Sequence, residues 1–256
     1  MTNPAKITKI LRLIEKAYGR RPAFRRTDPV DELVRTILSQ NTTDKNSLAA
    51  FAALKRRFRR WDELLRFNYY NIASLIRHAG LANIKAKRIK EVLAEIKRRE
   101  GRISLARLGK METADALAYL ESLKGVGPKT AACVLLFSFG KPVMPVDTHI
   151  FRVAKRLGLI ANDADIEEAH AALTAATPKQ LIYRFHLGII EHGRRTCKAG
   201  KPHCGSCVLR KLCRYGKRKV LNDTKSHRRG CKEDTEAHKL LREAGEDASP
   251  FAERAL

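Results

Sequence analysis

Apolar residues recur along this 256-residue chain with the spacing of an amphipathic α-helix, at positions i, i+3, i+4 and i+7. Each such stripe can bury one helix face, whereas runs of alternating apolar and polar residues, which would predict strands, are scarce. The sequence therefore predicts an all-α fold of about ten short helices joined by tight turns. The clearest stripes are Ile7, Ile10, Leu11 and Ile14; Val30, Leu33, Val34, Ile37 and Leu38; Leu48, Phe51 and Leu54; and Ile89, Val92, Leu93 and Ile96.

Capping residues mark where several of these helices begin. Asp28, which is followed by proline, suits the N-cap of the helix that carries the second stripe. Asp165, with Glu168 three residues later, predicts a capping box at the start of a helix over 166–176. A Thr-Pro pair ends that helix, and a further helix is expected over 179–192.

The composition changes near the end of the chain. Residues 217–256 are polar, basic and of mixed charge, with few apolar residues. Such a segment has too little apolar surface to form a core, so we expect it to be a disordered tail. Cys231 lies in this tail and is expected to be an unligated thiol.

The charge balance is strongly basic. Fifty-two Lys and Arg residues against 27 Asp and Glu residues give a formal net charge of +25. This excess favours nucleic-acid binding, while an ordinary basic protein and a membrane-surface protein remain less favoured alternatives. No apolar run approaches the length of a membrane-spanning helix. The first residues lack the apolar core of a signal peptide, so we expect a cytoplasmic protein.

Four of the six cysteines are crowded into one short loop with the spacing C-x6-C-x2-C-x5-C. Structural zinc sites usually have two short C-x2–4-C pairs, and only one such pair is present. Four thiolates from one compact loop suit a [4Fe-4S] cluster, with zinc or unligated thiols as less favoured alternatives. Basic residues that include Lys211 and Arg214 bracket the loop and could contact phosphates or simply be solvated. The four cysteines are Cys197, Cys204, Cys207 and Cys213.

The stretch LKGVGPKTA places two glycines and a proline between apolar segments, which a helix interior tolerates badly. We therefore expect a turn between a helix over 112–122 and a second helix over 128–138, which together form a helix–hairpin–helix. Glycines permit positive φ and a close approach of the backbone to a ligand. The N–H groups of Gly125, Val126 and Gly127, with the second helix N-terminus, can bind a phosphate.

Lys129 and Asp147 are the two residues whose positions suggest chemistry. Lys129 lies in the first turn of the second hairpin helix, where the helix dipole disfavours a positive charge. From the residues alone, a phosphate contact and a nucleophilic free amine explain this lysine equally well. Asp147, in MPVDTHIFRV, precedes an amphipathic segment and suits an N-cap. A carboxylate there could also stabilise positive charge that develops on a sugar.

The stretches LKGVGPKTA and PVDTHIFRV and the cysteine spacing, in this order, resemble the endonuclease III family of helix–hairpin–helix DNA glycosylases. The stretches ILSQNTTD, GLANIKAKRI and LGIIEHGRRTC agree with the same family, and the resemblance covers residues 5–216. It implies two helical domains with a DNA-binding cleft between them. A six-helix barrel would cover 22–141, and an iron–sulfur domain would combine 1–21 with 142–216.

The resemblance also assigns roles to residues. Lys129 matches the nucleophile that forms a Schiff base with the sugar, and Asp147 matches the carboxylate that helps to activate it. Leu81 matches the residue that enters the base stack, although it could also be a core residue. Asn41 matches the residue that fills the gap left by the flipped base, although it could instead cap a helix, and Gln40 could fill the gap in its place. Thr130, in the hairpin, is expected to bind DNA together with the glycine turn.

The implied function is that of a bifunctional DNA glycosylase and abasic-site lyase for oxidised pyrimidines. It would carry a [4Fe-4S] cluster and act as a monomer on double-stranded DNA that contains damaged bases or abasic sites. We would expect it in a prokaryotic cytoplasm, associated with the nucleoid. Arg35 stands where adenine glycosylases of the family carry a glutamate, which argues against adenine removal. A family member for alkylated or mismatched bases and a non-catalytic iron–sulfur DNA-binding protein are the alternatives.

Overall fold

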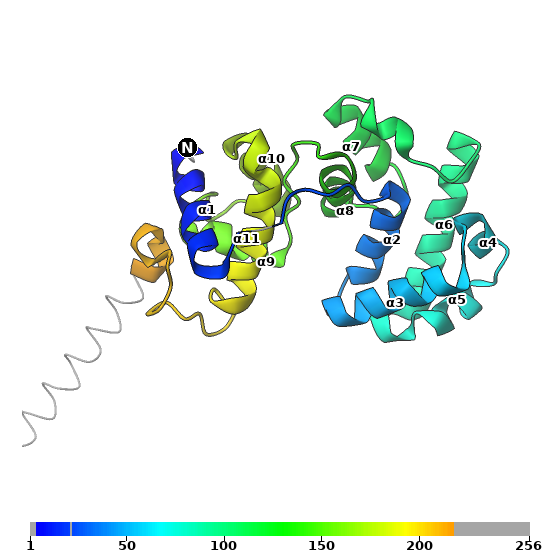
Figure 1. The fold of residues 1–256 in the computed structure, drawn as a ribbon, viewed down its shortest axis with the longest axis horizontal. Helices are drawn as coiled ribbons and strands as arrows, with labels where there is room; N and C mark the ends of the chain where they lie inside the picture. Colours follow the sequence, from blue (N-terminus) through cyan, green and yellow to red (C-terminus); the bar gives the residue numbers. More distant parts are fainter. Residues whose placement is uncertain (1–3, 21, 218–256) are drawn as a thin grey trace, which may run out of the picture.

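The computed structural model describes residues 4–20 and 22–217 of the chain (Figure 1). Eleven α-helices and several short 3-10 turns form these two ranges, and no strand occurs within them. The all-α prediction is therefore confirmed. The predicted tail over 217–256, with Cys231, lies outside the described residues except for its first position.

The helices are short and follow one another closely. None of those described is both long enough and apolar enough to cross a membrane. Their bounds are α1 (Pro4–Tyr18), α2 (Pro29–Ser39), α3 (Asp44–Arg57), α4 (Trp61–Leu65), α5 (Tyr69–Leu75), α6 (Ala82–Glu100), α7 (Thr113–Glu121), α8 (Pro128–Val134), α9 (Thr148–Leu157), α10 (Ile166–Ala176) and α11 (Ile182–Arg195).

The two ends of the described chain meet on one side of the molecule. Figure 1 shows α1 on the same side of the molecule as α9, α10 and α11, while α2 to α6 lie together on the other side and α8 lies between. The Lys6 Nζ donates hydrogen bonds to the carbonyl oxygens of Leu157, at 2.7 Å, and Gly158, at 3.3 Å. Arg184 of α11 donates from Nε to the carboxylate of Glu15 at 2.9 Å. The N-terminal helix is thus fixed to helices that come late in the sequence.

The start of α2 is capped as predicted. Asp28 Oδ1 accepts hydrogen bonds from the N–H groups of Val30, at 3.0 Å, and Asp31, at 2.9 Å. Two of the four N–H groups that a helix start leaves unpaired are satisfied in this way. The proline after Asp28 occupies the first helical turn, where its missing N–H costs no hydrogen bond.

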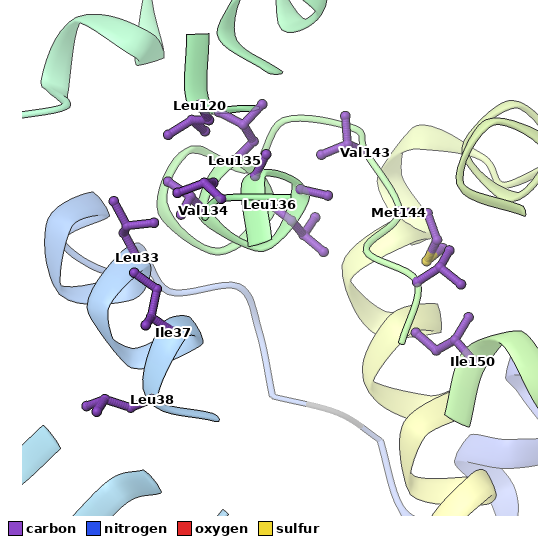
Figure 2. Close-up of a cluster of buried hydrophobic side chains, with 14 of the residues drawn as sticks. Leu33, Ile37, Leu38, Leu120, Val134, Leu135, Leu136, Val143, Met144 and Ile150 are labelled. Atoms are coloured by element: carbon purple, nitrogen blue, oxygen red, sulfur yellow. The ribbon is translucent and has the colours of Figure 1, made fainter. Parts of the chain in front are cut away.

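The core joins α2 to α8. Figure 2 shows Leu33 and Ile37 of α2 projecting toward the helical segment that carries Val134 and Leu136. All four side chains are buried, with at most 2% of their surface exposed. Complete burial of side chains of this size contributes about 1.5–3 kcal/mol each. This packing fixes the position of α8, and with it the position of the glycine turn before it.

Three of the four predicted apolar stripes are buried throughout. The exception is the stripe of Leu48, Phe51 and Leu54. Leu54 is fully buried and Phe51 partly, but Leu48 is 55% exposed. The prediction that Leu48 belongs to the core is therefore wrong. The first turn of α3 borders an open cleft, so an apolar residue with helical spacing faces solvent there.

The helices of the predicted hairpin are present but shorter than expected. The first, predicted over 112–122, is α7, and the second, predicted over 128–138, is α8. After α8 the chain continues as a π-helical segment, Leu135–Phe139, which ends at Gly140 with φ of 67°. The helical period alone does not distinguish an α-helix from this wider turn, which explains the difference.

The capping box before α10 is confirmed. Glu168 N–H donates to Asp165 Oδ1 at 2.8 Å, and Asp165 N–H donates to Glu168 Oε2 at 3.0 Å. The helix that follows α10, predicted over 179–192, begins with a 3-10 turn at Lys179–Leu181 and continues as α11.

Replacing Ile37 by alanine should lower the free energy of unfolding by about 2–5 kcal/mol, because the removed side chain leaves a cavity between α2 and α8. Urea unfolding followed by circular dichroism measures this loss. Leu48→Ala is the matched control and should stay within about 0.5 kcal/mol of the parent. Equal losses in the two variants would contradict the placement of Ile37 in the core.

Candidate active site

One open cleft brings together several of the residues that the sequence singled out. Its walls come from α2, α3, α8, α9, α10 and α11. The predicted residues that line it are Lys129, Asp147, Gln40, Asn41, Gly127 and Thr130. The predicted residues that do not line it are Gly125, Val126, Leu81, Lys211 and Arg214.

Asp147 is held firmly at the edge of this cleft. It is the N-cap of α9, and its Oδ1 accepts a hydrogen bond from the N–H of Ile150 at 2.8 Å. The segment before it is fixed by His186, whose Nδ1 lies 3.1 Å from the carbonyl oxygen of Pro145. Burial lowers the pKa of His186 to about 4, so the ring is neutral at pH 7. Its Nδ1 carries the proton, since a carbonyl oxygen can only accept.

Lys129 reaches the same cleft from a different helix. It lies in the first turn of α8, after Gly127 as N-cap and Pro128 as first helical residue. Pro128 suits this place because its φ is already that of a helix and the position needs no N–H. The lysine side chain is half-buried and lines the cleft together with Asp147. An amine and a carboxylate from separate helices therefore face one solvent-accessible space.

Two buried groups near Lys129 experience its charge. Burial raises the pKa of Glu32, and the positive charge of Lys129 opposes part of that rise. Burial also raises the pKa of the Cys133 thiol to about 11, again against the effect of Lys129. Both side chains line the cleft. The charge of Lys129 thus acts on a buried carboxyl group and on a buried thiol in the same cleft.

The glycine turn before α8 needs its first glycine. Gly125 has φ of 84°, and a Cβ at this position would lie 2.4 Å from Arg88 Nε. Gly127 has φ of −96°, so its backbone does not require glycine. The Val126 N–H donates to the carbonyl oxygen of Leu123 at 2.9 Å. Of the three N–H groups expected to face a phosphate, those of Gly125 and Gly127 have no partner in the described part of the chain.

Asn41 and Leu81 have strained backbones. Among the described residues they are the non-glycine positions with positive φ, at 51° and 50°. A left-handed backbone costs most residues about 1–2 kcal/mol. Leu81 is 53% exposed, so it is not a core residue. Asn41 caps neither neighbouring helix, since Gln40 ends α2 and Thr43 begins α3. Strain of this kind clusters at binding sites.

Two cationic side chains of α6 hold the turns that carry these residues. The fully buried Lys85 Nζ donates to the carbonyl oxygens of Leu38, at 2.8 Å, and Ala79, at 2.7 Å. One ammonium group thereby joins the end of α2 to the turn before α6. Arg88 Nη1 donates to Gln40 Oε1 at 2.8 Å, and its side chain lies against the glycine turn. The side chain of Gln40 is therefore engaged.

The cysteine loop forms a second pocket. Figure 1 shows its segment, in orange, beside α1 and away from α2 to α6. Arg156 Nη1 donates to Cys197 Sγ at 3.3 Å, and the Gly216 N–H donates to Cys213 Sγ at 3.3 Å. In the described ranges, no three His, Cys, Asp or Glu side chains are grouped closely enough to hold a single metal ion. The thiols that line the pocket are Cys197, Cys204, Cys207 and Cys213.

The two basic residues singled out beside this loop are exposed. Lys211 follows Arg210 in a short 3-10 turn, and Arg214 comes directly after the last cysteine of the loop. The side chain of Arg214 passes over Gly158, where a Cβ would lie 2.7 Å from its Cδ. Neither residue lines the cleft, so any contact that they make with DNA lies outside it.

Comparison with known proteins identifies the family. Residues 34–179 match the HhH-GPD superfamily of base excision DNA repair proteins. Endonuclease III of Thermotoga maritima is 35% identical over 222 residues, which cover 85% of this chain and 99% of that protein. The chain belongs to the endonuclease III family. Endonuclease III of Escherichia coli K12 is 34% identical over 190 residues, or 74% of this chain and 85% of that protein.

A solved structure agrees with this membership of the endonuclease III family. A trapped covalent intermediate of endonuclease III with DNA has 29% sequence identity and a TM-score of 0.73, covering 86% of this chain and all of that one. The chain is therefore a DNA glycosylase of base excision repair with the helix–hairpin–helix fold, and its partner is DNA.

Sequence reasoning did not single out several residues that shape this endonuclease III site. Lys85, Arg88 and His186 act through buried or partly buried hydrogen bonds to backbone or side chains that are distant in sequence. Glu32 was hidden in an amphipathic helix, where an acidic residue in the first turn is common. A single sequence gives no signal for such contacts, because each depends on which helices meet.

Lys85→Met should loosen both strained turns at once. It removes the buried ammonium and leaves two carbonyl groups without their donor, each at a cost of about 1–3 kcal/mol. Hydrogen exchange followed by mass spectrometry should show faster exchange at residues 39–43 and 79–82, while α1 and α9 keep their protection.

Lys87→Met is the matched control, since Lys87 lies two residues along the same helix and its side chain is 66% exposed. It should leave the exchange of both turns unchanged. Faster exchange confined to only one turn in Lys85→Met would show that Lys85 does not link the two.

Proposed function

We propose that this member of the endonuclease III family is a bifunctional glycosylase and abasic-site lyase that removes oxidised pyrimidines from double-stranded DNA. The observation that carries this proposal is that Lys129 and Asp147, from separate helices, line one cleft. A lysine at a helix start and a carboxylate fixed as an N-cap are suited to nucleophilic attack on a sugar and to support of its charge.

The reaction begins when a damaged nucleotide leaves the base stack and enters the cleft. The Lys129 amine attacks C1′ of the sugar, and the bond from C1′ to the base breaks with its electron pair leaving on the base. Loss of a proton from the lysine nitrogen and opening of the sugar ring give a Schiff base. Removal of a 2′ proton then expels the 3′ phosphate, so the strand is cut on the 3′ side. Asp147 stabilises the positive charge on the sugar.

The geometry around the cleft supports the DNA contacts in this proposal. The N–H groups of Gly125 and Gly127 bind a phosphate. Thr130 lies in the first turn of α8, where its N–H donates to the Gly127 carbonyl oxygen at 2.9 Å. The exposed Leu81 enters the base stack beside the extruded nucleotide. Asn41 fills the gap, because the amide of Gln40 is already bonded to Arg88.

The two helical groups correspond to two domains in this proposal. The barrel covers 22–141, and the second domain combines 1–21 with 142–216. Support comes from the contacts of α1 with the end of α9 and with α11. Arg194 of α11 also forms a two-pronged ion pair with Asp44 of α3 across the cleft, at 2.6 and 3.0 Å. The enzyme would act as a cytoplasmic monomer.

The cysteine pocket fits a [4Fe-4S] cluster. Its four thiols come from one loop, and two of them accept hydrogen bonds from N–H donors, which stabilise thiolates. A single zinc ion would need all four sulfurs within about 2.3 Å of one point, whereas a cluster takes one sulfur at each iron. When bound, the cluster would cross-link the loop, so that Lys211 and Arg214 can bind phosphates.

Borohydride reduction should trap a covalent adduct between the enzyme and a duplex that contains an abasic site. Lys129→Ala should abolish the adduct and strand cleavage, because no other amine is placed beside Asp147 on the cleft walls described here. Lys124→Ala, which changes an exposed lysine before the glycine turn, is the control and should trap normally. A panel of duplexes with oxidised, alkylated or mismatched bases tests the lesion class. Normal trapping by Lys129→Ala would overturn the proposal.

Purified protein should contain about four iron atoms per chain and a yellow-brown chromophore. Cys213→Ser should lose the iron, whereas Cys133→Ser, which changes a cysteine outside the loop, should keep it. Elemental analysis and visible absorption make both measurements. One zinc per chain in place of iron would contradict the assignment.

A further inference from the structure

The cleft wall beside Lys129 contains a carboxyl group to which the proposed reaction gives no role. Glu32 lies in the first turn of α2, and only 7% of the residue is exposed. It nevertheless lines the same cleft as Lys129 and Asp147. Carboxyl groups are seldom buried without a close partner, and those that line a reaction cleft are candidates for proton transfer.

The contacts of Glu32 on its own helix are weak. The Thr36 hydroxyl donates to Oε1 at 3.5 Å, and Arg35 Nη1 lies 3.6 Å from Oε2. The Arg35 guanidinium also lies over the ring of Phe51, and its buried Nε has no hydrogen-bond partner among the described residues. A tight two-pronged ion pair, which would fix Glu32 as a carboxylate, is therefore not formed.

The groups that face Glu32 from other elements leave it able to hold a proton. They are the hydroxyl of Thr27 before α2, the Lys129 amine and Cys133 thiol of α8, and the Tyr183 phenol of α11. Burial raises the pKa of Glu32, and the Arg35 charge, the Thr27 hydrogen bond and the Lys129 charge oppose this only in part. The carboxylic acid form consequently persists closer to neutral pH than in an exposed glutamate.

We propose that Glu32 is a further catalytic residue, the general acid that protonates the damaged base as it leaves. This inference rests on the proposed function of the cleft. Glu32 and Lys129 lie on helices that pack against one another, so one nucleotide in the cleft can reach both groups. Lys129 then acts on the sugar while Glu32 acts on the base.

The proton balance closes within the site. As the bond from C1′ to the base breaks, its electron pair remains on the base, and the Glu32 O–H bond breaks to give that base a proton. The Lys129 nitrogen, now bonded to C1′, carries a positive charge and one proton more than the Schiff base needs. The Glu32 carboxylate takes this proton and returns to the acid form. No further reactant is required.

Glu32→Gln tests the proposal, because glutamine keeps the shape and cannot give up a proton. Single-turnover excision from a duplex with one 5,6-dihydrothymine should slow by about 100-fold, the usual effect of losing a general acid. Cleavage at a preformed abasic site has no leaving base and should slow by less than about fivefold. The parent excision rate should fall as pH rises through the raised pKa of Glu32, and the variant should lack this dependence.

Asp31→Asn is the matched control, since Asp31 is the adjacent carboxylate of α2 and bonds Trp61 and Lys55 away from the cleft. This variant should keep the rates of excision and of abasic-site cleavage within about twofold of the parent rates. The excision rate on a substrate with a more acidic leaving base should fall less in Glu32→Gln, because such a base leaves with less need of a proton. A role for Glu32 in structure alone would slow both reactions equally.

An unchanged excision rate, or equal losses on the two substrates, would overturn the proposal for Glu32. Borohydride trapping separates this outcome from failure of the proposed function. If Glu32→Gln has no selective effect while trapping still depends on Lys129, only the role of Glu32 is lost. If trapping is independent of Lys129, the proposed function itself fails.

Discussion

The packing of α2 against α8 is the contact on which the site depends. Leu33 and Ile37 of α2 lie on one side of a buried interface, and Val134 of α8 and Leu136 of the π-helical segment that follows it lie on the other. The start of α8 carries Lys129, and α2 carries Glu32 and ends in the turn with Asn41. Because protein cores are close-packed, a shift at this interface would move all three residues. Hydrophobic packing thus sets the distance between the reacting groups.

Buried polar groups then fix the positions of the turns and of the segment before Asp147, which helix packing alone does not determine. Lys85 joins the end of α2 to the turn before Leu81, and His186 holds the segment that leads to Asp147. An ammonium or imidazole in such surroundings must keep its partners, because an unpaired buried polar group costs about 1–3 kcal/mol. These contacts hold Asn41 and Leu81 in left-handed backbones that would otherwise relax. Pre-organisation of this kind reduces the cost of binding a distorted duplex.

Local signals were good predictors wherever one segment determined its own structure. The Asp28 cap and the box formed by Asp165 and Glu168 were read correctly, since a cap involves residues only three apart. Leu48 was misplaced because helical spacing shows which face is apolar but not whether another helix covers it. The π-helical segment after α8 was missed for a related reason, because the period of the apolar residues barely differs there.

The sequence by itself determined the helices, the glycine turn, the four-cysteine loop and the residues that mark the endonuclease III family. These features depend on backbone preferences and short spacings, which are the same in any fold. Only the tertiary structure decided that Lys129, Asp147 and Glu32 share one cleft, and that Gln40 is engaged by Arg88 while Asn41 is not. The physical reason is that burial and electrostatic environment arise from contacts between distant segments. A carboxyl group such as Glu32 has no unusual property until α8 packs against its helix.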